Sequence, residues 1–237
     1  MGKRLISASA SDILEMTAAE LKQSIKASEG RVILSENVAT RESFIGDITN
    51  SEIARAFGAD LILLNGVDVL KPYIFGLEVK EESFVKELQN LVGRPIGVNL
   101  EPVDLEANMA EDRLTISKGR QANLETIKEI ERLGMNFVCF TGNPGTGVTN
   151  TEIEKTIKLA KKYFSGLIIA GKMHGAGVDE PVADMKAIES FIEAGADVIL
   201  VPAVGTVPGF DESELKEVVK LAHSKGALVL SAIGTSQ

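Results

Sequence analysis

The chain has 237 residues, 44% of them hydrophobic and 25% charged, a balance typical of a folded soluble protein. Its formal net charge of −9 argues against sequence-independent binding to nucleic acid or to an anionic membrane. The single cysteine, Cys139, excludes an internal disulfide, and no apolar run approaches the ~20 residues of a membrane helix. We therefore expect a cytoplasmic protein with neither nucleic-acid nor membrane partners.

A short pattern recurs along the chain: a helical stretch, a glycine, one or two small or polar residues, and an apolar run. The glycines are Gly58, Gly134, Gly195 and Gly226. Each is expected to end a helix in the left-handed conformation, and each apolar run is typical of a strand buried on both faces. Repeated units of this kind predict alternating strands and helices around a parallel sheet.

The expected strands span residues 32–35, 61–64, 96–100, 137–140, 167–170, 198–201 and 228–231, with a weaker candidate at 5–7. The expected helices span 11–28, 50–57, 81–92, 121–133, 150–163, 182–194 and 211–225. Seven or eight such units favour a TIM (β/α)8-type barrel over a doubly wound sheet. No linker or charge block divides the sequence, so residues 1–237 are expected to form one domain.

The sequence stops soon after the last expected strand. Either residues 5–7 close the barrel as an eighth strand, or the barrel lacks its last βα unit. We favour the second interpretation, because Leu5–Ser7 is brief and flanked by charge. An open sheet edge would invite self-association, so a homo-oligomer is a candidate state.

A glycine-rich loop, Thr141 to Asn150, joins an expected strand to an expected helix, with Thr149 and Glu152 at the spacing of a capping box. Free N–H groups at a helix start suit a phosphate or a carboxylate. The loop is neither a P-loop nor a GxGxxG fingerprint. The candidate anion-binding residues are Thr141, Asn143, Gly145, Thr146, Gly147 and Thr149. The alternative is a tight turn whose glycines only supply positive φ.

Polar side chains follow the other expected strands at the end where barrel enzymes carry their chemistry. The ligand candidates here are Glu36, Asn65 and Asn99, with Glu101 as a catalytic candidate. Carboxylates and amides can bind hydroxyls, transfer protons or hold Mg²⁺. The alternative is a hydrogen-bonded layer that caps the barrel core. No zinc-binding motif is present, so no metal ligand is assigned and Mg²⁺ is the one candidate cofactor.

Lys172 and His174 follow the strand at 167–170 and are the remaining catalytic candidates. A desolvated lysine can act as a base, a Schiff-base amine or an anion clamp, and a histidine can relay protons. The alternatives are a lysine at the barrel rim and an ordinary loop histidine. The long loop 103–120 ends in Arg120, which could close over an anionic substrate; the alternative is a solvated loop.

The segments Ile25–Arg31, Gly97–Pro102, Thr141–Asn150, Ile169–His174 and Ala232–Gln237 resemble an uncharacterised bacterial TIM-barrel family. Its members are labelled haloacid dehalogenase-like, or likened to phosphoenolpyruvate phosphonomutase and the BtpA proteins. The resemblance runs almost end to end and implies a barrel with one further strand and helix. The Asp-x-Asp motif of the dehalogenases and the Lys-Lys-Cys-Gly segment of the phosphonomutases are missing, so it implies a fold rather than a reaction.

These patterns predict an enzyme of lyase or isomerase type acting on a small phosphorylated or carboxylated metabolite. Lys172 would be the base or electrophile, and His174 would relay protons. The polar strand ends would orient the substrate, and the glycine-rich loop would hold its anionic group. The alternative is a regulatory protein that binds such a metabolite without turning it over.

Overall fold

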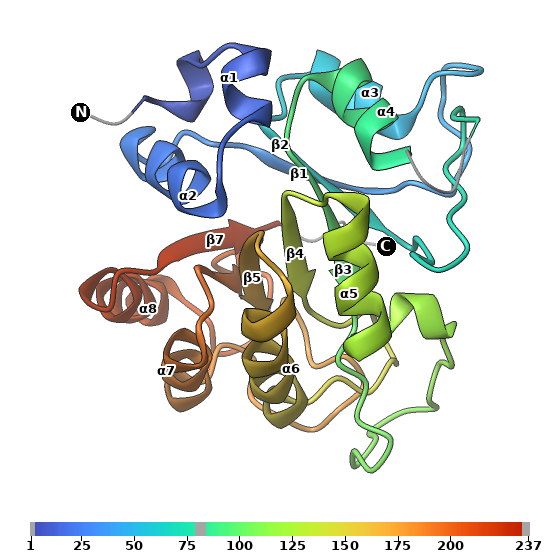
Figure 1. Cartoon of the computed structure of the whole chain (residues 1–237). Coiled ribbons are helices and arrows are strands. Elements are labelled where there is room, and N and C mark those ends of the chain that lie inside the picture. Colours follow the sequence, from blue (N-terminus) through green and yellow to red (C-terminus); the bar gives the residue numbers. More distant parts are fainter. Residues whose placement is uncertain (1–2, 79–83, 234–237) are drawn as a thin grey trace.

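Seven parallel strands form one sheet in the computed structural model, which describes residues 3–78 and 84–233. The strands are β1 (Leu34–Val38), β2 (Leu61–Asn65), β3 (Ile96–Leu100), β4 (Phe137–Phe140), β5 (Leu167–Gly171), β6 (Val198–Pro202) and β7 (Leu228–Ala232). Each pairs with the next one in the sequence, and the sheet curls into a half-barrel (Figure 1). All strand ends that carry polar residues therefore meet at one rim.

Helices cover the two faces of the sheet unequally. The convex face packs against α3 (Asn50–Ala56), α4 (Phe84–Val92), α5 (Leu124–Leu133), α6 (Asn150–Tyr163), α7 (Met185–Ala194) and α8 (Glu212–Ser224). The concave face is covered at one end by a short 3-10 helix (Leu5–Ser7), α1 (Ala10–Leu14) and α2 (Ala18–Ala27) (Figure 1). Alternate residues of one strand serve the two cores: Leu63 belongs to the concave core, whereas Ile62 belongs to the convex one.

The expected strands are confirmed within a few residues, and the incomplete barrel is confirmed as well. Residues 5–7 are not an eighth strand. Leu5 is buried in the concave core, and its N–H donates to Ser28 Oγ at 3.0 Å, which fixes this segment as a helical turn beneath the sheet. The helix expected at 11–28 is also divided in two, because Thr17 and Glu20 form a capping box that starts a new helix.

The other expected helices differ only at their ends. Asn123 and Asp184 accept hydrogen bonds from backbone N–H groups, so α5 and α7 begin three residues later than expected. Residues 81–83 of the helix expected at 81–92 lie outside the described residues. No helix in the described ranges is long and apolar enough to cross a membrane.

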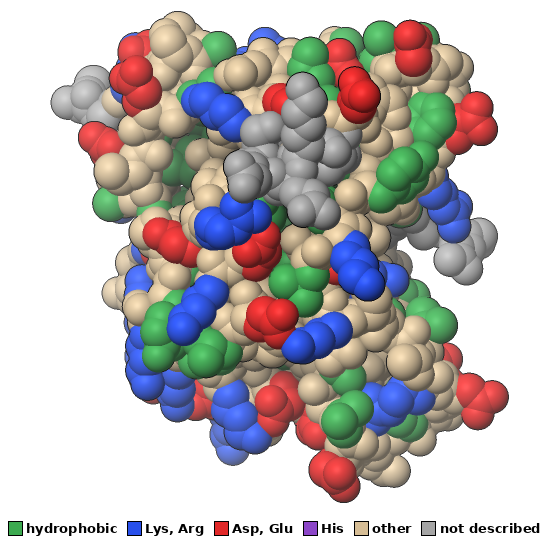
Figure 2. Space-filling view, turned by 45° about the vertical axis from the view of Figure 1, so that its right-hand side comes forward, with side chains coloured by type: hydrophobic (Ala, Val, Ile, Leu, Met, Phe, Trp, Pro, Cys, Tyr) green, Lys and Arg blue, Asp and Glu red, His purple; other side chains and the backbone are tan. Residues whose placement is uncertain are grey.

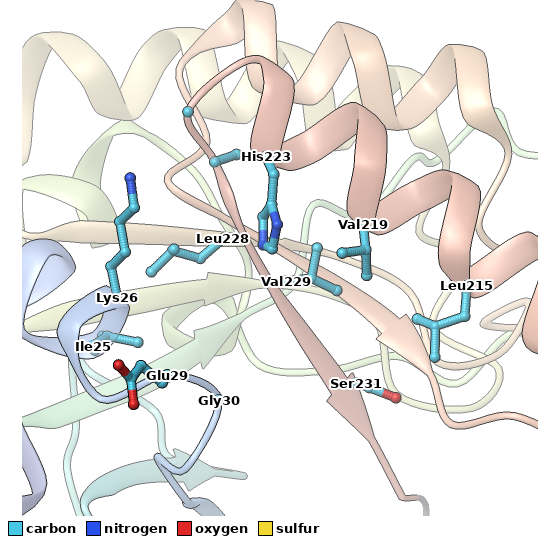
Figure 3. Close-up of a pocket in the computed structure, with 12 residues that line it drawn as sticks. Ile25, Lys26, Glu29, Gly30, Leu215, Val219, His223, Leu228, Val229 and Ser231 are labelled. Atoms are coloured by element: carbon cyan, nitrogen blue, oxygen red, sulfur yellow. The ribbon is translucent and has the colours of Figure 1, made fainter.

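The open side of the half-barrel lies between β1 and β7, the first and last strands in the sheet order. An apolar cavity of about 590 Å³ lies there, with Ile25 near the end of α2 on one side and Leu215 and Val219 of α8 on the other (Figure 3). A second cavity of about 290 Å³ reaches the concave core beside Leu34 and Phe137. On the face drawn in Figure 2, basic and acidic side chains are interspersed.

Gly97 on β3 lets an aromatic ring pack against the strand that carries the polar residues of the rim. A Cβ atom at this position would lie 2.3 Å from the ring of Phe137. Phe137 is fully buried in the concave core, so the ring has little room to move. The glycine therefore fixes how closely β3 and β4 approach just below Asn99.

We expect Gly97→Ala to lower the free energy of unfolding by about 1–3 kcal/mol, because the new methyl group overpacks this contact. Phe137→Leu in the same chain should recover part of that loss. Urea unfolding of the two single variants and the double variant measures the coupling. Strictly additive effects would contradict the proposed contact.

Candidate functional site

Glu101 is the centre of a hydrogen-bonded network at the rim. Its side chain is almost completely buried directly after β3. Arg120 Nη2 donates to Oε1 at 2.9 Å, Asn143 Nδ2 donates to the same oxygen at 2.8 Å, and the Asn143 N–H donates to Oε2 at 2.8 Å. Both carboxylate oxygens are therefore occupied by groups of the protein.

Arg120 reaches Glu101 because the chain returns to β3 after the long loop. The Glu101 N–H donates to the Arg120 carbonyl at 2.9 Å, and the Ala122 N–H donates to the Glu101 carbonyl at 2.8 Å. The Arg120 side chain is 26% exposed. Within the described residues its guanidinium makes one side-chain hydrogen bond, and a guanidinium carries five N–H donors. Arg120 can therefore hold Glu101 and still present donors to a ligand.

Two further pairs join four strands to this network. Asn65 and Asn143 exchange amide hydrogen bonds of 3.0 and 3.1 Å. Asn99 Nδ2 donates to Glu36 Oε1 at 2.8 Å. Glu36, Asn65, Asn99 and Asn143, which the sequence predicted as ligand residues, thus lie together with Glu101 and Arg120.

Two titratable groups at the rim have shifted pKa values. Partial burial raises the pKa of Glu36, and the negative charge of Glu101 adds to this, while hydrogen bonds from Asn99 and Asn65 oppose it. The residue as a whole is nevertheless exposed, so solvent limits this rise and the carboxylate is accessible to a ligand. It is held closer to neutrality than an ordinary glutamate.

Burial lowers the pKa of His174, and the charge of Lys172 adds to this effect, against the opposing charges of Glu101 and Glu111. The Ala176 N–H donates to His174 Nδ1 at 3.1 Å. The neutral imidazole therefore carries its proton on Nε2 and can offer it as a hydrogen-bond donor.

The glycine-rich loop is covered by the protein itself. Thr141, Gly145, Thr146, Gly147 and Thr149 are all buried. The loop 103–120 packs on them: Leu114 N–H donates to the Gly145 carbonyl at 2.7 Å, and Asp104 N–H donates to the Gly147 carbonyl at 2.9 Å. The loop 103–120 is thus hydrogen-bonded to the glycine-rich loop, although Leu105 and Leu114 within it are exposed.

The start of α6 already holds a carboxylate. The Asn150 N–H donates to Glu180 Oε2 at 2.9 Å, and the Glu152 N–H donates to Thr149 Oγ1 at 3.2 Å. The same dipole that suits a ligand anion thus stabilises a glutamate of the chain. Anion binding by this loop stays a prediction, and it would require Glu180 to leave.

Lys172 makes no hydrogen bond to the Glu101 network among the described residues. Its side chain is 2% exposed, and its Nζ donates to Glu180 Oε2 at 2.9 Å and to the Val148 carbonyl at 3.3 Å. It follows Gly171 on β5, with a different orientation from Met173, which packs against the concave core. Lys172 therefore ties the loop after β5 to the start of α6.

Glu180 is the residue that the sequence analysis missed. It bonds both Lys172 and Asn150, although it lies in a polar stretch with no catalytic motif. No sequence pattern indicates it, because only the fold brings it to Lys172 and Asn150. No group of three or more His, Cys, Asp or Glu residues that could hold a metal is present in the described ranges.

The fold and this rim define an α/β half-barrel of the TIM-barrel type with a polar site at the carboxyl ends of its strands. Residues 6–237 match the family described as "Domain of unknown function (DUF7916)", and the chain belongs to this family. No curated protein sequence matches the chain.

Solved structures share the fold at low sequence identity. A protein provisionally described as a lyase/mutase from Burkholderia cenocepacia J2315 aligns with a TM-score of 0.53 and 15% identity, over 91% of this chain and 73% of that one. Oxaloacetate acetylhydrolase in complex with oxalate aligns at 0.50 and 13%, over 91% and 79%. A 2,3-dimethylmalate lyase, a member of the PEP mutase/isocitrate lyase superfamily, aligns at 0.48 and 12%, over 91% and 79%.

We expect Lys172→Ala to lower the free energy of unfolding by roughly 3 kcal/mol, because it leaves the Glu180 carboxylate without its buried partner. The matched variant is Lys155→Ala, which removes an exposed ion pair with Glu152 on α6 and should cost less than about 0.5 kcal/mol. Urea unfolding of both variants tests the difference. A Lys172→Ala protein as stable as the wild type would contradict the structural role.

Proposed function

We propose that the rim binds a small carboxylated or phosphorylated metabolite and catalyses a lyase or isomerase reaction on it. The anionic group of the metabolite binds to Arg120 and His174. Glu36 acts as the base. Glu101, Asn65 and Asn143 hold these groups in place.

One observation carries the proposal: Glu36 and His174, at the same rim, have pKa values shifted in opposite directions, that of Glu36 raised and that of His174 lowered. A raised glutamate pKa makes the carboxylate a stronger base, and a lowered histidine pKa keeps the imidazole neutral. Such a pair is typical of acid–base sites, and both members respond to the charge of Glu101.

The chemistry follows from these groups. Glu36 removes a proton from the substrate, and negative charge develops on a substrate oxygen. The N–H donors of Arg120 and the Nε2–H of His174 stabilise that charge. Lyases that break a bond beside a carboxylate and isomerases that move a proton share this first step. We assign Lys172 no part in it, because its side chain is 2% exposed and its ammonium is bonded to Glu180 and the Val148 carbonyl.

The solved structures support the assigned fold and suggest a small anion with which to test ligand binding. The oxaloacetate acetylhydrolase structure contains oxalate, a small dicarboxylate, and that protein shares the fold of this chain. Glu101 is not a free metal ligand, since both oxygens accept hydrogen bonds from Arg120 and Asn143. We therefore propose no resident Mg²⁺ at this carboxylate. Self-association through the open edges of β1 and β7 stays a proposal.

The proposal predicts that Arg120→Lys weakens oxalate binding by about tenfold or more, because lysine keeps the charge beside Glu101 but loses the forked donors. Isothermal titration measures the affinity. The matched variant is Arg113→Lys in the same loop, whose guanidinium bonds the Thr146 and Leu105 carbonyls, and it should bind oxalate like the wild type. Equal weakening by both variants would contradict the assignment.

A metabolite panel followed by NMR tests turnover. Glu36→Gln should lower the rate by about 10²–10⁴-fold while oxalate still binds. In the wild type, kcat/KM should rise with pH as Glu36 loses its proton, with a midpoint above the ordinary value of 4.5. Glu42→Gln, an exposed glutamate after β1, is the control. If an anion binds at Arg120 and no metabolite is consumed, the chain is a metabolite-binding regulator instead.

A further inference from the structure

The amide oxygen of Asn99 is a buried acceptor that has no hydrogen-bond partner among the described residues. Asn99 is 4% exposed and lies on β3, two residues before Glu101. Buried polar atoms in folded proteins are nearly always bonded, so an acceptor left open at a candidate site requires a reason.

The orientation of this amide is fixed by its neighbour. Asn99 Nδ2 donates to Glu36 Oε1 at 2.8 Å. Rotating the amide by half a turn would place its oxygen against a carboxylate oxygen, and two acceptors repel. The amide nitrogen therefore faces Glu36, and Oδ1 stays an acceptor that only a donor from elsewhere can satisfy.

The location of Oδ1 connects it to the anion site. Residues two apart on a strand share one face and lie about 7 Å apart. The side chains of Asn99 and Glu101 therefore leave β3 about that far apart on one face, and Glu101 holds Arg120. A molecule of three or four carbon atoms spans such a distance.

We infer that the ligand of this site carries a hydrogen-bond donor, a hydroxyl or an ammonium group, close to its anionic group, and that Asn99 Oδ1 accepts from it. The inference rests on the proposed function and names its substrate class: hydroxy acids, amino acids or their phosphorylated counterparts. Glu36, which accepts a hydrogen bond from the Asn99 amide, lies beside the position expected for this donor of the ligand. Its side chain reaches solvent. Asn99 is then a specificity-determining residue.

Three dicarboxylates of one length test this inference by isothermal titration: succinate without a donor, malate with a hydroxyl and aspartate with an ammonium group. Wild type should bind malate or aspartate at least about tenfold more tightly than succinate, because a site built to accept a hydrogen bond rejects a ligand that lacks the donor. Whichever of the two binds more tightly identifies the donor.

Asn99→Leu should abolish this preference, so that malate and aspartate bind no more tightly than succinate. The matched variant is Asn37→Leu: the Asn37 side chain is also buried without a partner, but β1 places it on the face opposite to Glu36. The Asn37→Leu variant should still bind malate or aspartate more tightly than succinate. If Asn99→Leu does not fold, the comparison of the three ligands on wild type still decides.

Equal affinity of wild type for all three ligands would overturn the inference, since Asn99 Oδ1 would then need only water. If that common affinity falls in Arg120→Lys, the proposed anion site stands without the inference. If none of the three binds while oxalate still does, the inference is overturned and the proposed anion site stands; if oxalate does not bind either, the proposed function fails as well. A preference that survives in Asn99→Leu would assign the recognition to another residue.

Discussion

The carboxylate of Glu101 determines how the rim of the half-barrel is built. A charge that is 1% exposed must be compensated inside the protein, and Arg120 and Asn143 do this with three hydrogen bonds. Arg120 arrives from the end of the long loop, and Asn143 arrives from the loop after β4. One buried charge therefore fixes two loops against β3, and through Asn143 it also positions Asn65 on β2.

This arrangement separates the polar residues into two groups. The first faces the concave side of the rim and contains Glu36, Asn99 and the Glu101 network. The second consists of Lys172, Glu180 and the start of α6, and it joins the loops after β4 and β5. The first group has open donors and acceptors, whereas the contacts of the second are made within the protein. We expect the first group to bind and react with the ligand, and the second group to hold the two loops in place.

The sequence predicted the strands well because their apolar runs are buried on both faces, and it predicted most helix ends because a glycine or a capping residue marks them. Because these apolar runs are continuous, they do not indicate which side chains point to the concave face and which to the convex face of the sheet. The orientation of Lys172 could therefore not be inferred. The carboxylate at the start of α6 was equally inaccessible to sequence reasoning. Glu180 lies 30 positions from Asn150, and only the packing of two loops brings them together.

An NMR titration of labelled protein with oxalate tests the central assignment most directly, because it separates the Arg120 site from the glycine-rich loop. We predict that the side-chain resonances of Arg120 and the amide of Asn143, which share Glu101, change together, while the amides of Gly145 and Gly147 stay in place. Chemical-shift changes confined to Gly145 and Gly147, with Arg120 unaffected, would contradict this account. They would instead indicate that the anion binds at the start of α6.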